Sequence, residues 1–168
     1  MSNMVDNRLR VTGPTKNLLS FVRCVKGETV LDFNKMWPMP KRIANGNTKN
    51  WINWTLENWG SMGNAHALDY GVETPNEELA HIYRTRGMCF ETPNAPPKVF
   101  ITFYAMLSKN LTFTLWYVDI MGGVAGKYTC KGDNEIKINS VYTFWKQRKR
   151  FEQIAQGRFG YNVDEWFD

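Results

Sequence analysis

Regular alternation of apolar and polar residues predicts several β-strands along this chain. Within residues 5–12 the odd positions are mainly apolar and the even positions are polar, which is the period of a strand with one buried face. Residues 111–119 alternate in the same way, and residues 124–130 follow after a two-glycine turn, which predicts a hairpin. Shorter strands are predicted at residues 88–92 and 135–138. The sequence therefore indicates four or five strands, mainly antiparallel.

Between these strands, apolar residues recur at the spacing of helices that bury one face. Helices are predicted from Thr15 to the glycine at position 27, and at residues 48–59, 76–86, 97–107 and 140–156. The helix that follows Pro97 is expected to bury a stripe formed by Val99, Phe100, Phe103, Met106 and Leu107.

The order of these elements predicts a single α+β domain that covers residues 1–168. A mainly antiparallel sheet with helices on one face fits the ferredoxin-like template, with a core from about residue 3 to about residue 130. A long irregular insertion is expected at about residues 41–87, where the composition turns polar. The C-terminal helix and tail, residues 139–168, lie outside that core.

Composition narrows the class of protein only slightly. The hydrophobic fraction of 43% excludes a disordered chain, and the aromatic fraction of 14% indicates either a ring-rich core or an aromatic binding surface. The N-terminus does not resemble a signal peptide and the apolar runs are short, so a cytoplasmic protein is expected, in the host cytoplasm if a phage encodes it.

The cysteines and histidines do not suggest a metal centre. Cys24, Cys89 and Cys130 are isolated and odd in number, which argues against a disulfide framework. With only His66 and His81 beside them, a zinc site would have to combine distant residues. Neither a metal nor a cofactor is therefore expected.

Four segments of the chain are similar to one family of phage and plasmid proteins. They are NMVDNRLRVTGP at residues 3–14, LDFNKMWPMP at 31–40, ENWGSMGNA at 57–65 and FETPNAPP at 90–97. Together they resemble the Api92-like proteins, which have a YubB-type ferredoxin-like domain. The resemblance implies a ferredoxin-like fold, residence on phages, prophages or conjugative plasmids, and no enzymatic activity. The chain departs from the family where Met62, Gly63 and Asn94 replace a lysine and two tryptophans.

An enzyme needs a nucleophile with a base, a metal or paired carboxylates. His66 and Asp69 are three residues apart, and Ser61 precedes them, so a Ser-His-Asp triad of a hydrolase is one interpretation. A solvated loop histidine is the simpler interpretation. The chain has no phosphate-binding loop and no nucleophile-elbow motif, so it is not expected to be an enzyme.

Two segments are candidate binding sites. In the first, Asn58, Trp59 and Asn64 belong to a turn whose tryptophan could grip a partner or stack on a base; the alternative is that Trp59 anchors the loop to the sheet. In the second, Lys146, Arg148, Lys149 and Arg150 form a basic cluster that could follow a phosphate backbone or face solvent. Arg148 falls near the apolar stripe of the predicted helix at residues 140–156, so an acidic partner from the tail is expected, either Asp164 or Glu165.

The sequence thus predicts a non-catalytic binding protein. The first hypothesis is an accessory protein of a bacteriophage or other mobile element that binds a macromolecule stoichiometrically, with a host defence component such as a CRISPR effector as the expected target. The alternative is a nucleic-acid-binding module that uses the basic helix and exposed aromatic rings. The net charge of +5 is modest, so any nucleic-acid binding is expected to be weak.

Overall fold

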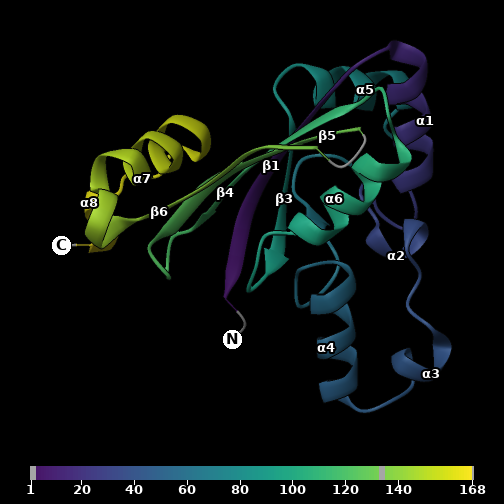
Figure 1. The fold of residues 1–168 in the computed structure, drawn as a ribbon, viewed down its shortest axis with the longest axis horizontal. Helices are drawn as coiled ribbons and strands as arrows, with labels where there is room; N and C mark the ends of the chain where they lie inside the picture. The colour runs from purple at the N-terminus through teal and green to yellow at the C-terminus, as the bar shows by residue number, and fades with distance from the viewer. Residues whose placement is uncertain (1–2, 133–134, 168) are drawn as a thin grey trace.

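The first strand lies in the interior of the sheet, and buried and more exposed residues alternate along most of it. β1 (Met4–Thr12) pairs on both sides, with β3 (Met88–Pro93) and with β4 (Thr112–Asp119). On the far side of β4 follow β5 (Val124–Lys131) and β6 (Glu135–Thr143), while β2 (His66–Ala67) pairs with β3. The order is β2-β3-β1-β4-β5-β6, and every neighbouring pair is antiparallel (Figure 1).

This computed structural model describes residues 3–132 and 135–167. The sheet has six strands rather than the expected four or five, because the two-residue β2 and a long β6 both join it. The chain is an α+β protein, as the sequence predicts.

One face of the sheet, here called the front face, is the one toward which Leu9, Leu115 and Tyr128 point. It is covered by α1 (Thr15–Val25), α5 (Asn76–Arg84) and α6 (Lys98–Leu107). Their aromatic side chains meet edge to face; the Phe21 ring centroid lies 5.1 Å from that of Tyr83. The aromatic richness of the sequence therefore contributes mainly to a thick core.

Three further helices lie in the segment between α1 and β2. They are α2 (Phe33–Met36), α3 (Lys41–Ala44) and α4 (Thr48–Asn58), of which α4 confirms the helix predicted there. Figure 1 shows α3 and α4 at the bottom of the view, on the opposite side from α5 at the top. The later part of the expected insertion is not peripheral, because α5 buries Leu79, Ile82 and Tyr83 in the main core.

The buried stripe predicted for α6 is wrong in part. The residues that point into the core are Phe100, Ile101, Tyr104 and Ala105. Val99, Met106 and Leu107 are exposed, and Phe103 is half-buried. Because α6 is apolar around most of its circumference, the spacing of its apolar residues does not define which side faces the sheet.

The C-terminal part of the chain differs most from the sequence prediction. The helix expected to begin at residue 140 begins at Phe144, because Ser140 to Thr143 continue β6. The segment reads SVYT, and its β-branched and aromatic residues favour a strand. The helix α7 (Phe144–Phe159) is followed by α8 (Asp164–Phe167).

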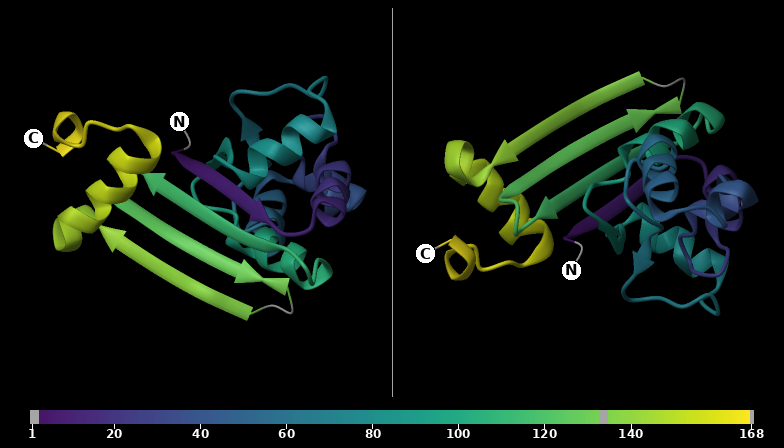
Figure 2. Two further views of the ribbon diagram at one scale, coloured as in Figure 1. Left: turned by 90° about the horizontal axis from the view of Figure 1, so that it is seen from above. Right: turned by 90° about the horizontal axis from the view of Figure 1, so that it is seen from below.

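α7 packs on the opposite face of the sheet, here called the back face, so the expectation of helices on one face does not hold for it. Phe151 and Ala155 of α7 form a second buried cluster with Val118 of β4 and Ala125 of β5. Figure 2 shows α7 and α8 set apart from the front-face helices, at the end of the sheet where β6 leads into α7. Within the described residues, no helix is long and apolar enough to span a bilayer.

Candidate functional site

Trp59, the tryptophan of the first candidate site, is part of the core. Its side chain is only 3% exposed. The indole Nε1 donates a hydrogen bond to the Trp37 carbonyl oxygen at 3.0 Å, and the ring meets Trp54 and Phe33 edge to face. A turn follows α4 as predicted, but Trp59 is not available there to bind a partner, and the alternative, that Trp59 anchors this segment, agrees with the structure.

The two asparagines of that site also serve the fold. Asn58 Nδ2 donates to the Trp54 carbonyl oxygen at 2.8 Å, within the last turn of α4. The Asn64 side chain bridges two segments: its Oδ1 accepts from the Phe33 backbone N–H at 2.8 Å, and its Nδ2 donates to Asp32 Oδ1 at 2.7 Å. These contacts satisfy the polar groups that a partner would have to reach.

The residues of the imagined triad are not arranged for catalysis. Ser61 is fully buried, and its hydroxyl donates to the Gly63 carbonyl oxygen at 2.6 Å. His66 is exposed on the edge strand β2, where its register partner is Glu91 of β3. Within residues 3–132 and 135–167, no cluster of three or more His, Cys, Asp or Glu side chains could hold a metal ion.

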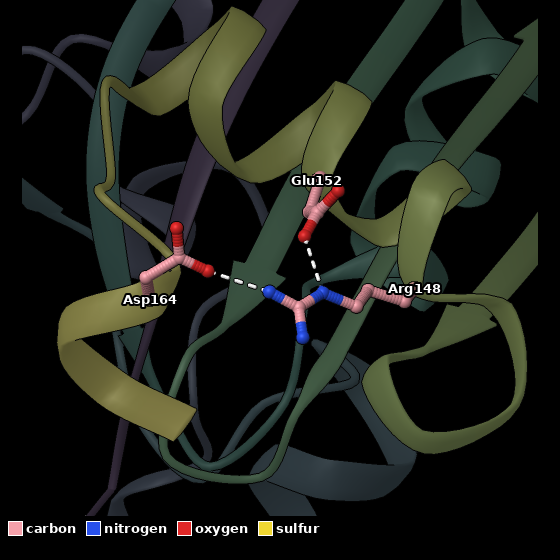
Figure 3. Close-up of polar contacts among 3 residues, drawn as sticks. All are labelled: Arg148, Glu152 and Asp164. Carbon is pink, nitrogen blue, oxygen red and sulfur yellow. Dashed lines mark hydrogen bonds and ion pairs between the residues drawn. The ribbon is translucent and has the colours of Figure 1, made fainter. Parts of the chain in front are cut away.

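The basic cluster on α7 is exposed along its whole length, and one of its members is paired as expected. Arg148 forms ion pairs with Glu152 at 2.7 Å and with Asp164 of α8 at 2.5 Å, so the predicted acidic partner from the tail is confirmed (Figure 3). Its guanidinium group also lies over the Phe144 ring, 5.0 Å from the centroid. Arg148 therefore fixes α8 to α7.

A row of side chains crosses the back face of the sheet at right angles to the strands. Its members are consecutive register partners on β3, β1, β4, β5 and β6: Cys89, Arg8, Trp116, Lys127 and Ser140. We call this set the cross-strand row. Its two cations flank the tryptophan on neighbouring strands, because residues directly opposite each other in an antiparallel sheet point to the same face.

Aromatic rings hold the cations of this face in place. The Arg158 guanidinium lies over the Trp116 ring at 4.3 Å from the centroid, and the Lys127 ammonium approaches the same ring at 5.6 Å. Arg8 lies over the Phe159 ring at 5.9 Å. Such contacts orient a cation without cancelling its charge, so the positive potential remains available to a ligand.

The basic helix meets the cross-strand row at Arg150. A pocket of about 290 Å³ between α7 and the sheet is lined by Arg150, Trp116, Lys127 and Tyr142 among others. Two members of the sequence-predicted cluster, Lys146 and Lys149, are exposed on α7 outside that lining. The structure therefore brings one predicted residue, Arg150, into the same pocket as Lys127, a cation of β5.

Carboxylates also lie on this face, and Glu91 of β3, the register partner of Asp6, is one of them. Asp6 of β1 accepts a hydrogen bond from the Tyr161 hydroxyl, and burial raises the pKa of its carboxyl group. Glu135 of β6 pairs with Lys137 at 2.7 Å, and that hydrogen bond lowers the pKa of Glu135. Farther from α7, Arg10 and Lys131 also lie on this face, and Glu135 is the register partner of Lys131. Together with Arg8, Lys127, Arg150 and Arg158, these cations outnumber the carboxylates of Asp6, Glu91 and Glu135.

A second surface, on the front face, is apolar. A groove of about 460 Å³ runs between α6 and β6, and its walls include Trp37, Phe103, Met106 and Ile136. Lys98 lines it as well, and burial lowers the pKa of that amine. We call this the α6–β6 groove. It exists because the exposed side of α6 carries apolar residues, and β6 is the last strand of the sheet.

Sequence reasoning missed the cross-strand row. Arg8 and Lys127 of the row, and Arg158 of α7 beside it, are far apart in the sequence, and no local motif connects them. The alternation in residues 5–12 does place Arg8 on the polar face of β1. Its neighbours across the sheet become visible only once strand register is known.

Comparison of the chain with family models, with curated proteins and with solved structures finds no match. The resemblance to the Api92-like proteins stays a prediction, and the functional argument depends on the geometry of the two surfaces.

Proposed function

We propose that this chain acts by stoichiometric binding rather than by catalysis, and that its ligand is single-stranded nucleic acid bound on the back face of the sheet. The observation that carries the proposal is the cross-strand row, in which Arg8 and Lys127 flank Trp116, with Arg158 and Arg150 beside them. Cations of this density neutralise phosphates, and binding then gains from the release of counterions.

A single strand fits this surface better than a duplex. Lys127 and Arg150 line the recess between α7 and the sheet, where an extended chain could lie over β4, β5 and β6. Trp116 is only 6% exposed because Arg158 covers it, so the expected contacts are mainly ionic, with little base stacking. Modest affinity and a steep dependence on salt follow.

We also infer that the sheet is built on a ferredoxin-like core. The strand order β2-β3-β1-β4 supports this inference, as do the positions of α1 after β1 and of α6 between β3 and β4. On this view β5 and β6 extend the sheet, and α7 covers part of a face that such cores leave open.

The test compares two triple variants with the same change in net charge. Lys127→Glu, Arg150→Glu, Arg158→Glu reverses the charge of the back face. Lys41→Glu, Lys49→Glu, Lys35→Glu reverses exposed cations on α2, α3 and α4. Fluorescence anisotropy with a labelled single-stranded oligonucleotide measures affinity at low salt, and circular dichroism checks folding. Loss of binding in the first variant alone supports the proposal, and equal losses contradict it.

A second candidate function keeps the first hypothesis from the sequence, an accessory protein of a mobile element that binds a host defence protein. The Trp59 turn no longer supports it, since Trp59 is buried. The α6–β6 groove does, because Met106 and Ile136 are each more than half exposed in an apolar setting beside an unpaired sheet edge. An extended segment of a partner protein could add to β6.

This second function has its own test. Cells that carry a CRISPR effector directed against a plasmid would express the native chain or the Met106→Lys, Ile136→Lys variant. Protection of the plasmid by the native chain, lost in the variant but retained in the back-face variant, would favour protein binding. No protection by the native chain would remove this candidate.

A further inference from the structure

A recess at the β3 end of the cross-strand row brings two arginines together. It has a volume of about 360 Å³ and is lined by Arg8, Asp69, Tyr70, Arg86, Gly87 and Cys89. We call it the two-arginine pocket. Arg8 enters it from the centre of the sheet, and Arg86 from the turn between α5 and β3.

A glycine keeps the two arginines close to each other. Gly87 follows Arg86 directly and has a φ of +85°, a conformation that favours glycine. A Cβ at this position would lie 3.0 Å from Cγ of Arg8 and 3.1 Å from the Leu9 carbonyl oxygen. The stem of Arg8 therefore packs on the backbone next to Arg86, and a larger residue would displace it.

Aromatic rings lie against both guanidinium groups. Arg86 lies over the Tyr70 ring at 5.5 Å, and Arg8 lies over the Phe159 ring at 5.9 Å. The Arg8 Nε atom is buried without a hydrogen-bond partner. Neither arginine takes part in an ion pair among the described residues, although the Asp69 carboxylate lines the same pocket. Buried N–H donors without acceptors are costly, so an acceptor ligand is the natural complement.

We propose that the two-arginine pocket binds a terminal phosphate monoester, the phosphorylated end of a nucleic-acid strand. This inference rests on the proposed function, because the pocket lies at the end of the cross-strand row. A phosphate monoester carries about 1.5 to 2 negative charges near neutral pH, more than the single charge of an internal phosphodiester. Its three free oxygens can accept from two guanidinium groups at once.

The experiment compares three oligonucleotides of one sequence, carrying a 5′-phosphate, a 3′-phosphate or no terminal phosphate. The expected result is a preference of about tenfold for one phosphorylated end, the factor that corresponds to 1.4 kcal/mol. Arg86→Ala should abolish this preference and leave binding of the unphosphorylated strand nearly unchanged. Lys127→Glu should weaken all three alike, and Arg42→Ala on α3 is the control. Equal binding of the three strands by the native chain would overturn the inference.

A second measurement separates this inference from the proposed function. Inorganic phosphate is titrated into ¹⁵N-labelled protein, and the Arg side-chain Nε–H signals are followed by NMR. Saturable shifts of the Arg8 and Arg86 signals, with the Arg8 shift lost in Arg86→Ala, would support the pocket even if no oligonucleotide bound. Signals that do not move with phosphate, in a chain that still binds strands through the row, would refute the pocket and leave the proposed function intact.

Discussion

The guanidinium group of Arg158 lies 4.3 Å from the centroid of the Trp116 ring and shields it from solvent. The ring is thus a platform for a cation rather than a free stacking surface. Trp116→Leu should keep most of the apolar burial but release Arg158 and Lys127 from fixed positions. We expect affinity for a single strand to fall severalfold, while the dependence of affinity on salt stays the same because no charge is lost. Titrations at several salt concentrations check both quantities.

Removal of a charge, unlike removal of the ring, should change the dependence of affinity on salt. In Lys127→Ala one phosphate contact disappears, so the slope of log affinity against log salt should become shallower by about 0.7, the contribution of one phosphate in a single strand. Lys49→Ala on α4 should leave the slope unchanged. An unaltered slope in Lys127→Ala would show that this ammonium does not contact phosphate.

The Asp6 carboxyl group provides a prediction about pH. Burial raises its pKa in the folded protein, and the hydrogen bond from Tyr161 opposes that rise. The folded state therefore holds this proton more tightly than the unfolded state, so the group's contribution to stability is present at low pH and is lost as pH rises through the raised pKa. Asp6→Asn keeps an acceptor for the Tyr161 hydroxyl and removes the charge. As the pH rises above the ordinary carboxyl pKa of 3.8, stability in urea should fall less steeply in Asp6→Asn. An identical pH dependence would contradict the assignment.

Two phenylalanines of α6 lie in different environments: Phe100 in the core and Phe103 in the wall of the α6–β6 groove. Phe100 is fully buried, so Phe100→Ala should cost about 3–5 kcal/mol in free energy of unfolding. Phe103 is half-buried and packs against the Trp37 ring in a tilted arrangement at a centroid distance of 4.0 Å, so its truncation should cost clearly less, about 1–2 kcal/mol. Denaturant unfolding of both variants gives the comparison, and equal costs would place Phe103 in the core after all.

Some elements can be predicted from the sequence and others cannot, for physical reasons. Alternation predicted β1 because its two faces meet different environments, a core and a charged surface. The orientation of α6 was not predictable, since apolar residues surround it, and neither was the burial of Trp59, whose neighbours Asn58 and Gly60 are typical of exposed turns. The cross-strand row depends on register between strands far apart in the chain, which local patterns do not encode.

The contact between Gly126 and Tyr117 leads to the last prediction. The two residues are register partners on β5 and β4, and the Tyr117 ring lies over the glycine, so that an added Cβ would meet the ring carbon Cζ at 2.2 Å. Gly126→Ala must displace a buried ring, and overpacking of this kind costs about 1–3 kcal/mol. Tyr117→Leu alone should also destabilise the fold, because it removes that ring from the core. In the double variant the smaller side chain accommodates the new methyl group, so the total loss should be less than the sum of the two single losses. Thermal and urea unfolding of all four proteins complete the cycle. Additive losses would mean that the ring moves aside without strain and that this glycine is not required by the tyrosine opposite it.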